Sequence, residues 1–189
     1  TPTLPETLVV LANSAGDLIE LIKCQKDLLS AETNELSVYD KEIHVKQLLE
    51  TIKALFERND AYRDRSITLH PLQNDIVLHC DERLLKRVIV NAIKNAMEAI
   101  DKGDTVDLSV RAENHAVLFA IHNKSVIPQD VQSRIFRKSF STKSRDRGIG
   151  TYSIKLFTEK YLKGKVWFTS TPEQGTTFYI RIPNGNGTG

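Results

Sequence analysis

The segment from residue 82 to residue 100 restricts the possible folds more strongly than any other part of the sequence, because it reads as a helix with two unlike faces. Apolar residues recur at helical spacing on one face, at Leu84, Leu85, Val88, Ile89 and Ile93. The opposite face carries Asn91, Asn95 and Glu98 at i, i+4 and i+7, with Arg87 one turn earlier. Asp81 is placed to cap the start of this helix and Gly103 to close its end.

The polar face of this helix has two interpretations. Amides and a carboxylate are costly to bury without partners, so they either cap neighbouring backbone or bind a ligand. Amide oxygens are hard ligands that suit Mg²⁺, which bridges nucleotide phosphates in many enzymes. Taken alone, the face favours neither interpretation.

The other elements predict an α+β fold. Helical patterns cover residues 5–35, 45–56, 129–136 and 151–162, and strand-like runs cover 67–69, 76–80, 105–111, 116–122, 165–170 and 176–182. Residues 33–45 and 123–128 read as connections. Because helices and strands segregate, we expect a two-layer α/β sandwich with a mixed or antiparallel sheet, covered on one face by helices and preceded by a long N-terminal helix.

Composition limits the function classes. The chain has 189 residues, is 40% hydrophobic and carries a net charge of only +2. This content can fill a core, and the small charge argues against a nucleic acid polymer or an anionic membrane as the partner. No apolar run reaches about 18 residues, so we expect no membrane contact by this segment. The two cysteines lack metal-ligand spacing and are expected to be reduced thiols, which suits a cytoplasmic location.

The chain divides into three parts by pattern. We predict an N-terminal helical part at 1–38, a main domain at 39–183 and a disordered tail at 184–189. The long first helix is either an ordinary docked core helix or half of a helical dimerisation hairpin.

Two glycine segments flank the last predicted helix. Gly148 and Gly150 come just before it, where backbone N–H groups can approach a phosphate at the helix N-terminus. The preceding residues 139–147 are polar and cationic, which suits either a mobile lid over a polyphosphate or a solvated basic loop. The second segment, 175–178, is most simply a turn that opens the last strand.

In this order, the segments resemble the ATP-binding domain of sensor histidine kinases, in the GHKL ATPase superfamily that includes gyrase and MutL. Residues 90–99 look like the N box, 134–143 like the F box and the start of the ATP lid, 148–151 like the G2 box and 175–178 like the G3 box. The match covers roughly residues 75–183 and implies the Bergerat-type ATP-binding fold. Residues 8–35 look like the second helix of the family's dimerisation and phosphotransfer hairpin.

The resemblance implies roles for individual residues. Asn95 would ligate Mg²⁺ at the ATP phosphates, and Gly148 and Gly150 would let backbone approach them. Lys143 would stabilise charge at the γ-phosphate, with Arg147 near the end of the lid.

Two further roles follow from the same resemblance. Asn91 stands where ATP-hydrolysing members have a Glu, and because an amide cannot act as a general base, it favours phosphoryl transfer over hydrolysis. Thr176 would line the adenine pocket, and Glu98, where many members have a Lys, would act behind the residues that touch phosphate.

One motif departs from the family. The G1 box, Asp-x-Gly-x-Gly, has neither its Asp nor its glycines in residues 120–128. Counting back from Pro128 places His122 at the Asp position, whereas strand alternation from Ile121 places Asn123 there. We favour Asn123, whose amide oxygen can accept from the adenine amine without a charge. ATP binding is then expected to weaken by about 1–2 kcal/mol.

These observations predict a kinase fragment. The chain would bind Mg·ATP and pass the γ-phosphoryl to a His on a helix absent from it, for relay to a response regulator, within a full-length homodimer. Any membrane anchor of the parent protein would lie outside this chain. A degenerate domain acting as a nucleotide-poor scaffold is the alternative, and a serine kinase of the anti-sigma type is a third option.

Overall fold

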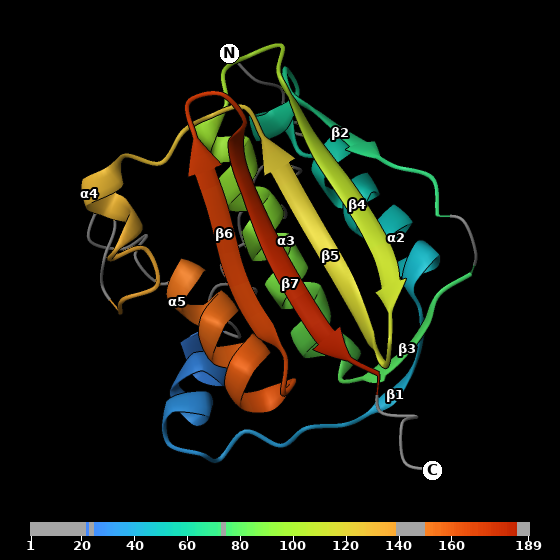
Figure 1. Ribbon diagram of the computed structural model, residues 1–189. Coiled ribbons are helices and arrows are strands. Elements are labelled where there is room, and N and C mark those ends of the chain that lie inside the picture. The colour runs from blue at the N-terminus through green and yellow to red at the C-terminus, as the bar shows by residue number, and fades with distance from the viewer. Residues whose placement is uncertain (1–21, 23–24, 73–74, 139–149, 185–189) are drawn as a thin grey trace, which may run out of the picture. The chain divides into compact units, whose positions relative to one another are not determined.

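The computed structural model describes residues 22, 25–72, 75–138 and 150–184 (Figure 1). The chain forms two compact units, Thr1–Ser37 and Val38–Gly189. In the first unit, residues 25–32 are helical, and the backbone N–H of Glu35 then donates to the carbonyl of Ser30 at 2.8 Å. The helix predicted over 5–35 is confirmed for residues 25–32 but ends there, because residues 33–34 form a turn with Asn34 at φ +64°; residues 1–21 and 23–24 lie outside the described residues.

The second unit contains a five-stranded mixed sheet in the order β2-β4-β5-β7-β6. Its strands are β2 (Ser66–Leu69), β4 (Thr105–Glu113), β5 (Ala116–Asn123), β6 (Lys165–Thr171) and β7 (Gly175–Pro183). β2 runs parallel to β4, and the other three pairs are antiparallel. The mixed sheet predicted from the sequence is therefore confirmed.

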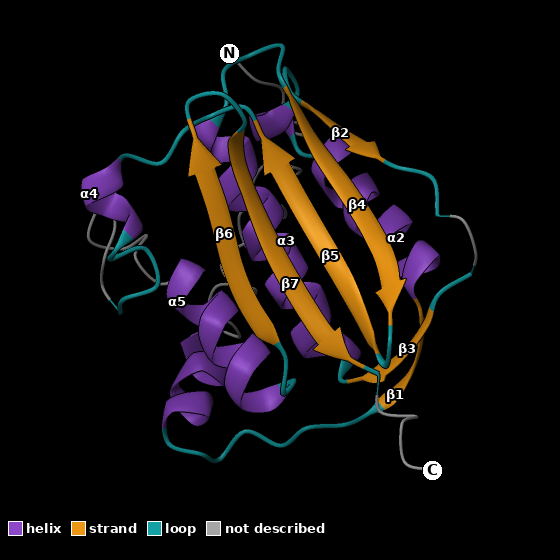
Figure 2. Cartoon of the chain, in the orientation of Figure 1, coloured by secondary structure: helices purple, strands orange, loops and turns teal. Residues whose placement is uncertain are grey.

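Helices cover one face of this sheet, as Figure 2 shows. They are α2 (Val45–Glu57), α3 (Glu82–Ala99) and α5 (Gly150–Lys155), which continues into a π-helical turn at Leu156–Tyr161. The apolar face predicted for α3 is buried, with Leu84, Leu85, Val88, Ile89 and Ile93 at 0% exposure. Phe119 and Ile121 of β5 bury their side chains in the same layer. The two-layer architecture thus follows from the helical spacing of the apolar residues in α3 and the alternate spacing of those in β5.

The sheet face away from the helices carries an aromatic pair. Trp167 of β6 and Tyr179 of β7 are cross-strand partners, and their rings stack with centroids 5.2 Å apart. Trp167 is 38% exposed. The helices α2, α3 and α5 all lie on the opposite face (Figure 1).

One predicted connection is wrong. Residues 41–44, expected to be loop, form β1 (Lys41–His44), which pairs antiparallel with β3 (Val77–Cys80). Ile43 is the buried residue of β1, at 4% exposure. The strand is short and its other side chains are polar, so the hydrogen bonds to β3 define it rather than an apolar alternation.

The ends of two helices also differ from expectation. Gly103 does not cap α3, which ends at Ala99 with Ile100 in an extended conformation. Gly103 instead occupies the turn before β4 at φ +86°, where its N–H donates to the carbonyl of Asp64. The helix expected near 129–136 is limited to α4 (Gln129–Gln132).

Two further properties concern the helices and the cysteine of the described residues. None of their helices is both long and apolar enough to span a bilayer. Cys80 is a free, buried thiol, and burial raises its pKa to about 12. A thiol that stays protonated is a poor nucleophile, so Cys80 acts as a core residue.

Candidate functional site

The polar face of α3 lies against α5 and the turn that follows it. Asn91 Nδ2 donates to Ser153 Oγ at 3.0 Å, and the Arg87 guanidinium lies 5.2 Å from the ring centroid of Phe157. A Cβ placed on Gly150 would lie 3.4 Å from Asn95 Oδ1. Arg87, Asn91 and Asn95 therefore each meet a residue of the segment 150–157, which brings the predicted N box and the end of the G2 box together.

Asn95 differs from Asn91 in its surroundings. Asn91 has the Ser153 hydroxyl as a partner, whereas the buried Asn95 Nδ2 has no hydrogen-bond partner. A buried polar group without a partner costs about 1–3 kcal/mol. Folds retain such groups where a ligand completes them, so the Asn95 amide fits a binding role.

The absence of a side chain at Gly150 keeps the space beside Asn95 open. Gly150 begins α5, and its Cα lies next to the Asn95 amide. A larger residue there would fill the space next to the amide. Gly150 thus contributes to the site because it has no side chain to fill this space.

A second group of predicted residues lies at the ends of β5 and β7. Asn123 and Thr176 are cross-strand partners, and both are buried, at 4% and 2% exposure. Asn123 Oδ1 accepts from the Ser125 N–H at 2.9 Å. This bond shapes the loop after β5, and it leaves one lone pair of the amide oxygen for a ligand.

The same strand ends show how the two candidates for the G1 position are oriented. His122 and Asn123 are consecutive, so they project to opposite faces of the sheet. The His122 ring bonds with Thr177 Oγ1 at 3.0 Å and is partly exposed, while Asn123 is buried on the helix side. The strand-alternation argument correctly predicted which of the two faces inward.

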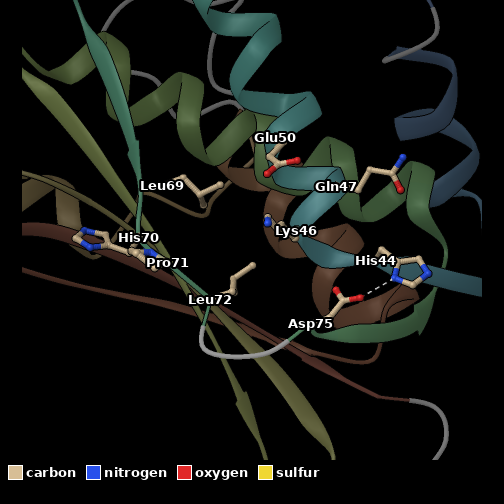
Figure 3. A pocket seen from close by; sticks show the side chains of 9 residues that line it. All are labelled: His44, Lys46, Gln47, Glu50, Leu69, His70, Pro71, Leu72 and Asp75. Atoms are coloured by element: carbon tan, nitrogen blue, oxygen red, sulfur yellow. Dashed lines mark hydrogen bonds and ion pairs between the residues drawn. The ribbon is translucent and has the colours of Figure 1, made fainter.

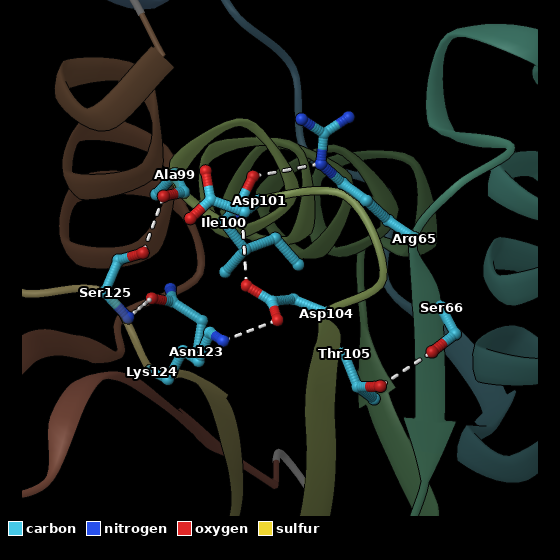
Figure 4. Close-up of polar contacts among 10 residues, drawn as sticks. All are labelled: Arg65, Ser66, Ala99, Ile100, Asp101, Asp104, Thr105, Asn123, Lys124 and Ser125. Carbon is cyan, nitrogen blue, oxygen red and sulfur yellow. Dashed lines mark hydrogen bonds and ion pairs between the residues drawn. The ribbon is translucent and has the colours of Figure 1, made fainter.

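Hydroxyl groups tie the loop after β5 to its neighbours, and Figure 4 shows the bond from Ser125 to Ala99 of α3. Thr176 Oγ1 donates to the Ser125 carbonyl at 2.7 Å and bonds with Ser170 Oγ at 2.8 Å. Ser125 Oγ donates to the Ala99 carbonyl at 2.6 Å, one turn beyond Asn95. The end of the N box helix and the loop after β5 are therefore fixed to each other.

An ion pair flanks the same loop. Lys124 Nζ lies 2.6 Å from Asp104 Oδ1 at the start of β4. The hydrogen bond and charge of Lys124 hold the pKa of Asp104 below its usual range, and Asp104 in turn raises the pKa of Lys124. Both groups are thus charged near neutral pH.

Sequence reasoning missed Ser125, Ser153 and Ser170. Ser153 lies inside an apolar helical pattern and Ser170 inside a strand pattern, so neither gives a signal of its own. Ser125 follows Asn123 by two positions, the spacing at which an asparagine side chain bonds backbone in a turn, and this signal could have been used.

Three predicted residues, Lys143, Arg147 and Gly148, lie outside the described residues, and so does residue 149 of the G2 box. On either side of this gap, Thr151 Oγ1 donates to the carbonyl of Ile135. The segments that flank 139–149 are therefore bonded to each other.

A separate cavity of about 790 Å³ lies at the start of α2 and the end of β2 (Figure 3). Its lining includes His44, Lys46, Glu50, His70 and Asp75, and His44 Nδ1 bonds with Asp75 at 3.2 Å. None of the residues predicted for nucleotide binding lines it. The cavity is open and of mixed charge, and it does not belong to the candidate site.

The chain was compared with known proteins. Residues 80–186 match the family described as "Histidine kinase-, DNA gyrase B-, and HSP90-like ATPase". Sporulation kinase A of Bacillus subtilis (strain 168) is 29% identical over 166 residues, which are 87% of this chain and 27% of that protein. The adaptive-response sensory kinase SasA of Rippkaea orientalis is 30% identical over 168 residues, 83% of this chain and 42% of that protein. The chain thus spans less than half of either relative.

Solved structures agree on the fold. The catalytic domain of the histidine kinase ThkA superposes with a TM-score of 0.69 at 24% identity, covering 77% of this chain and 96% of that one. ThkA in complex with the response regulator protein TrrA gives 0.72 at 21% identity, covering 100% of this chain and 55% of that one. The family match covers more than half of the chain and includes both asparagines of α3. The chain therefore belongs to the histidine kinase-, DNA gyrase B- and HSP90-like ATPase family.

Proposed function

We propose that this chain is the ATP-binding catalytic domain of a sensor histidine kinase. It would transfer the γ-phosphoryl of ATP to a His on a helix outside this chain, for relay to a response regulator. The observation that carries the proposal is the Asn95 side chain on the polar face of α3: its buried Nδ2 has no hydrogen-bond partner, and its Oδ1 lies beside Gly150, 3.4 Å from where a Cβ would stand. Family membership supports ATP as the ligand, and the names of the relatives support the kinase activity.

The residues around Asn95 fit Mg²⁺. Mg²⁺ is usually held by one or two protein oxygens together with substrate phosphates and waters. Among the described ranges, no group of three or more histidine, cysteine, aspartate or glutamate side chains could hold a metal ion by itself. The Asn95 Oδ1 atom, which lies next to the space left open at Gly150, is the protein oxygen that would contact the ion. When bound, the ion would neutralise phosphate charge.

Asn91 bears on the reaction type. Its amide cannot abstract a proton from water, and its nitrogen is engaged by Ser153. Hydrolysis therefore lacks a general base at this position, which favours transfer to an acceptor residue. The lack of a base at this position also disfavours a gyrase-like ATPase activity.

The other predicted residues are proposed in supporting roles. Asn123 would accept from the adenine amine through its remaining lone pair, and Thr176 would shape the pocket through its bonds to the loop after β5. Lys143, Arg147 and Gly148 would contact the phosphates.

The assembly is also a proposal. We propose a cytoplasmic domain of a homodimeric kinase whose partners are the phosphoacceptor helix of its own protein and a response regulator. The named complex of ThkA with TrrA supports the second partner. The N-terminal part, 1–38, would be the second helix of the dimerisation hairpin.

Titration calorimetry of this chain with a non-hydrolysable ATP analogue, with and without Mg²⁺, tests the proposal. We expect binding that depends on Mg²⁺ and that Asn95→Ala weakens at least tenfold, since a ligand bond to the ion is lost. Lys94→Ala is the matched control, because Lys94 is an exposed neighbour on the same helix and should bind like wild type.

The outcomes separate the two candidate functions. A wild-type chain that binds no nucleotide at millimolar concentration would contradict the proposal and favour the scaffold alternative. Binding that is independent of Mg²⁺ would contradict the role of Asn95 while leaving nucleotide binding in place.

A further inference from the structure

Ser153 lies at the point where α3 and α5 face each other and is 1% exposed. Its hydroxyl makes two hydrogen bonds. Oγ donates to the carbonyl of Gly150 at 2.8 Å and accepts from Nδ2 of Asn91 at 3.0 Å. One buried side chain thus contacts both the N box and the start of α5.

The chemistry of these bonds fixes the direction of the Asn91 amide. A serine hydroxyl has one proton, and a carbonyl can only accept, so the proton of Ser153 is directed to Gly150. The Asn91 group that approaches Oγ must then be a donor, which is the amide nitrogen. If the amide were flipped, Asn91 Oδ1 would face a lone pair of Ser153 Oγ and the two oxygens would repel each other. Asn91 Oδ1 therefore faces away from Ser153.

We propose that Ser153 is a positioning residue that holds Asn91 with its amide oxygen, and not its nitrogen, toward the bound nucleotide. This inference rests on the proposed function. The orientation matters because an amide oxygen can only accept, from a cation or a hydrogen-bond donor such as water, whereas an amide nitrogen would donate to a phosphate oxygen. Ser153 touches neither nucleotide nor metal in this scheme and acts through Asn91.

The same hydroxyl also holds the Gly150 carbonyl. Since the Gly150 Cα lies next to the Asn95 amide, Ser153 links both asparagines to the first turn of α5. Without the hydroxyl, the Asn91 side chain should lose its hydrogen bond to Ser153, and the Gly150 carbonyl should lose one hydrogen bond. The larger effect is expected at Asn91, whose side chain has no other hydrogen bond among the described residues.

Two measurements on this chain test the inference. In the nucleotide-free protein, the side-chain ¹⁵N–¹H₂ resonances of Asn91 should show slowed solvent exchange that Ser153→Ala removes. In titrations with Mg²⁺ and the ATP analogue, Ser153→Ala should weaken binding roughly three- to tenfold, the range of one lost hydrogen bond. Ser153→Thr, which keeps the hydroxyl, should restore both signals.

A double-mutant cycle with Asn91→Ala distinguishes positioning from a general structural role. If Ser153 acts through Asn91, Ser153→Ala should add little to the loss already caused by Asn91→Ala. Fully additive losses, or an Ala variant with unchanged Asn91 resonances, would overturn the inference. If Ser153→Ala fails to fold, Ser153→Cys replaces it, since a thiol has similar size and is a weak hydrogen-bonding group.

The design separates this inference from the function on which it rests. A wild-type chain that binds no nucleotide overturns both. Wild-type binding with an unaffected Ser153→Ala variant overturns the positioning role alone.

Discussion

At the residue scale, the two asparagines of α3 have opposite relations to stability. Asn91 is hydrogen-bonded, so replacing it removes a bond and leaves Ser153 short of a partner. Asn95 Nδ2 has no partner, so replacing it removes a buried unsatisfied group. Asn95→Ala should therefore lose binding without losing stability, as expected of a residue kept for function.

Gly175 lies where the backbone leaves no room for a side chain. It has φ +68°, and a Cβ there would lie 2.3 Å from the Asn123 carbonyl oxygen and 2.7 Å from the Lys124 Cα. Both atoms belong to backbone and cannot rotate away. Gly175→Ala should lower the free energy of unfolding by roughly 2–4 kcal/mol, measured by urea denaturation.

Gly103→Ala is the control for this variant. Gly103 also has a positive φ, +86°, but nothing lies within 4 Å of a Cβ built on it. Its loss should cost only about 1 kcal/mol, from the backbone conformation alone. Equal losses in the two variants would show that the close approach at Gly175 is unimportant.

Residue identity predicted part of the candidate site. Asn91, Asn95 and Gly150 could be grouped from their spacing and order, and strand alternation chose Asn123 over His122. The bonds of Ser153 and Ser170 could not be predicted, because each depends on two elements approaching within 3 Å. Hydroxyls of this kind have no sequence signature until tertiary packing selects their partners.

At the scale of elements, Asp81 joins three segments. Its Oδ1 accepts from the Leu84 N–H at 3.1 Å and caps α3, and its Oδ2 accepts from the Tyr39 N–H at 3.0 Å, just before β1. The carboxylate is 2% exposed and directly follows β3. The start of the N box helix and the entry into the second unit thus depend on one side chain.

Asp81→Ala and Asp81→Ser separate these two contacts. The Ala variant should lose about 1–3 kcal/mol of unfolding free energy in urea titrations, from the cap and the bond to Tyr39. The Ser variant can still cap α3 but has one oxygen, so we expect it to recover roughly half of the loss. A Ser variant as unstable as the Ala variant would contradict a capping role.

Elements were predictable where one periodicity dominates. The 3.6-residue pattern of α3 gave its position, its cap and its buried face. The strand β1 was not predicted, because it has four residues of which a single one is buried. Only its pairing with the distant β3 makes it a strand. The π-helical turn at Leu156–Tyr161 also has no signature, since its apolar spacing reads as ordinary helix.

At the scale of the whole molecule, three carboxylates are stabilised in their charged form. Hydrogen bonds from Arg181 and Arg111 lower the pKa of Glu113. Lys102 lowers the pKa of Asp64 in the same way, and Lys124 lowers that of Asp104. The groups lie before β2 and at both ends of β4, so they are distributed along one side of the sheet. All are near the surface, so each contribution is modest and sensitive to salt.

These shifts predict acid sensitivity. The folded pKa of each group lies below its unfolded value, so the folded chain binds fewer protons in acid, and stability falls as the pH falls from about 5 through the folded pKa values. The melting temperature should therefore drop below roughly pH 4. Glu113→Gln should flatten this drop, and 1 M salt should reduce it; a pH-independent melting temperature would contradict the assignment.

The order of the strands has a consequence for synthesis on the ribosome. β7 follows β6 in the chain but lies between β5 and β6, and it is the sheet partner through which β6 joins the sheet. As the chain emerges, β6 therefore has no strand to pair with until β7 has been synthesised. Thr176, the partner of Asn123, also arrives with β7. The part of the candidate site that Asn123 and Thr176 form therefore cannot be complete before β7 has been made.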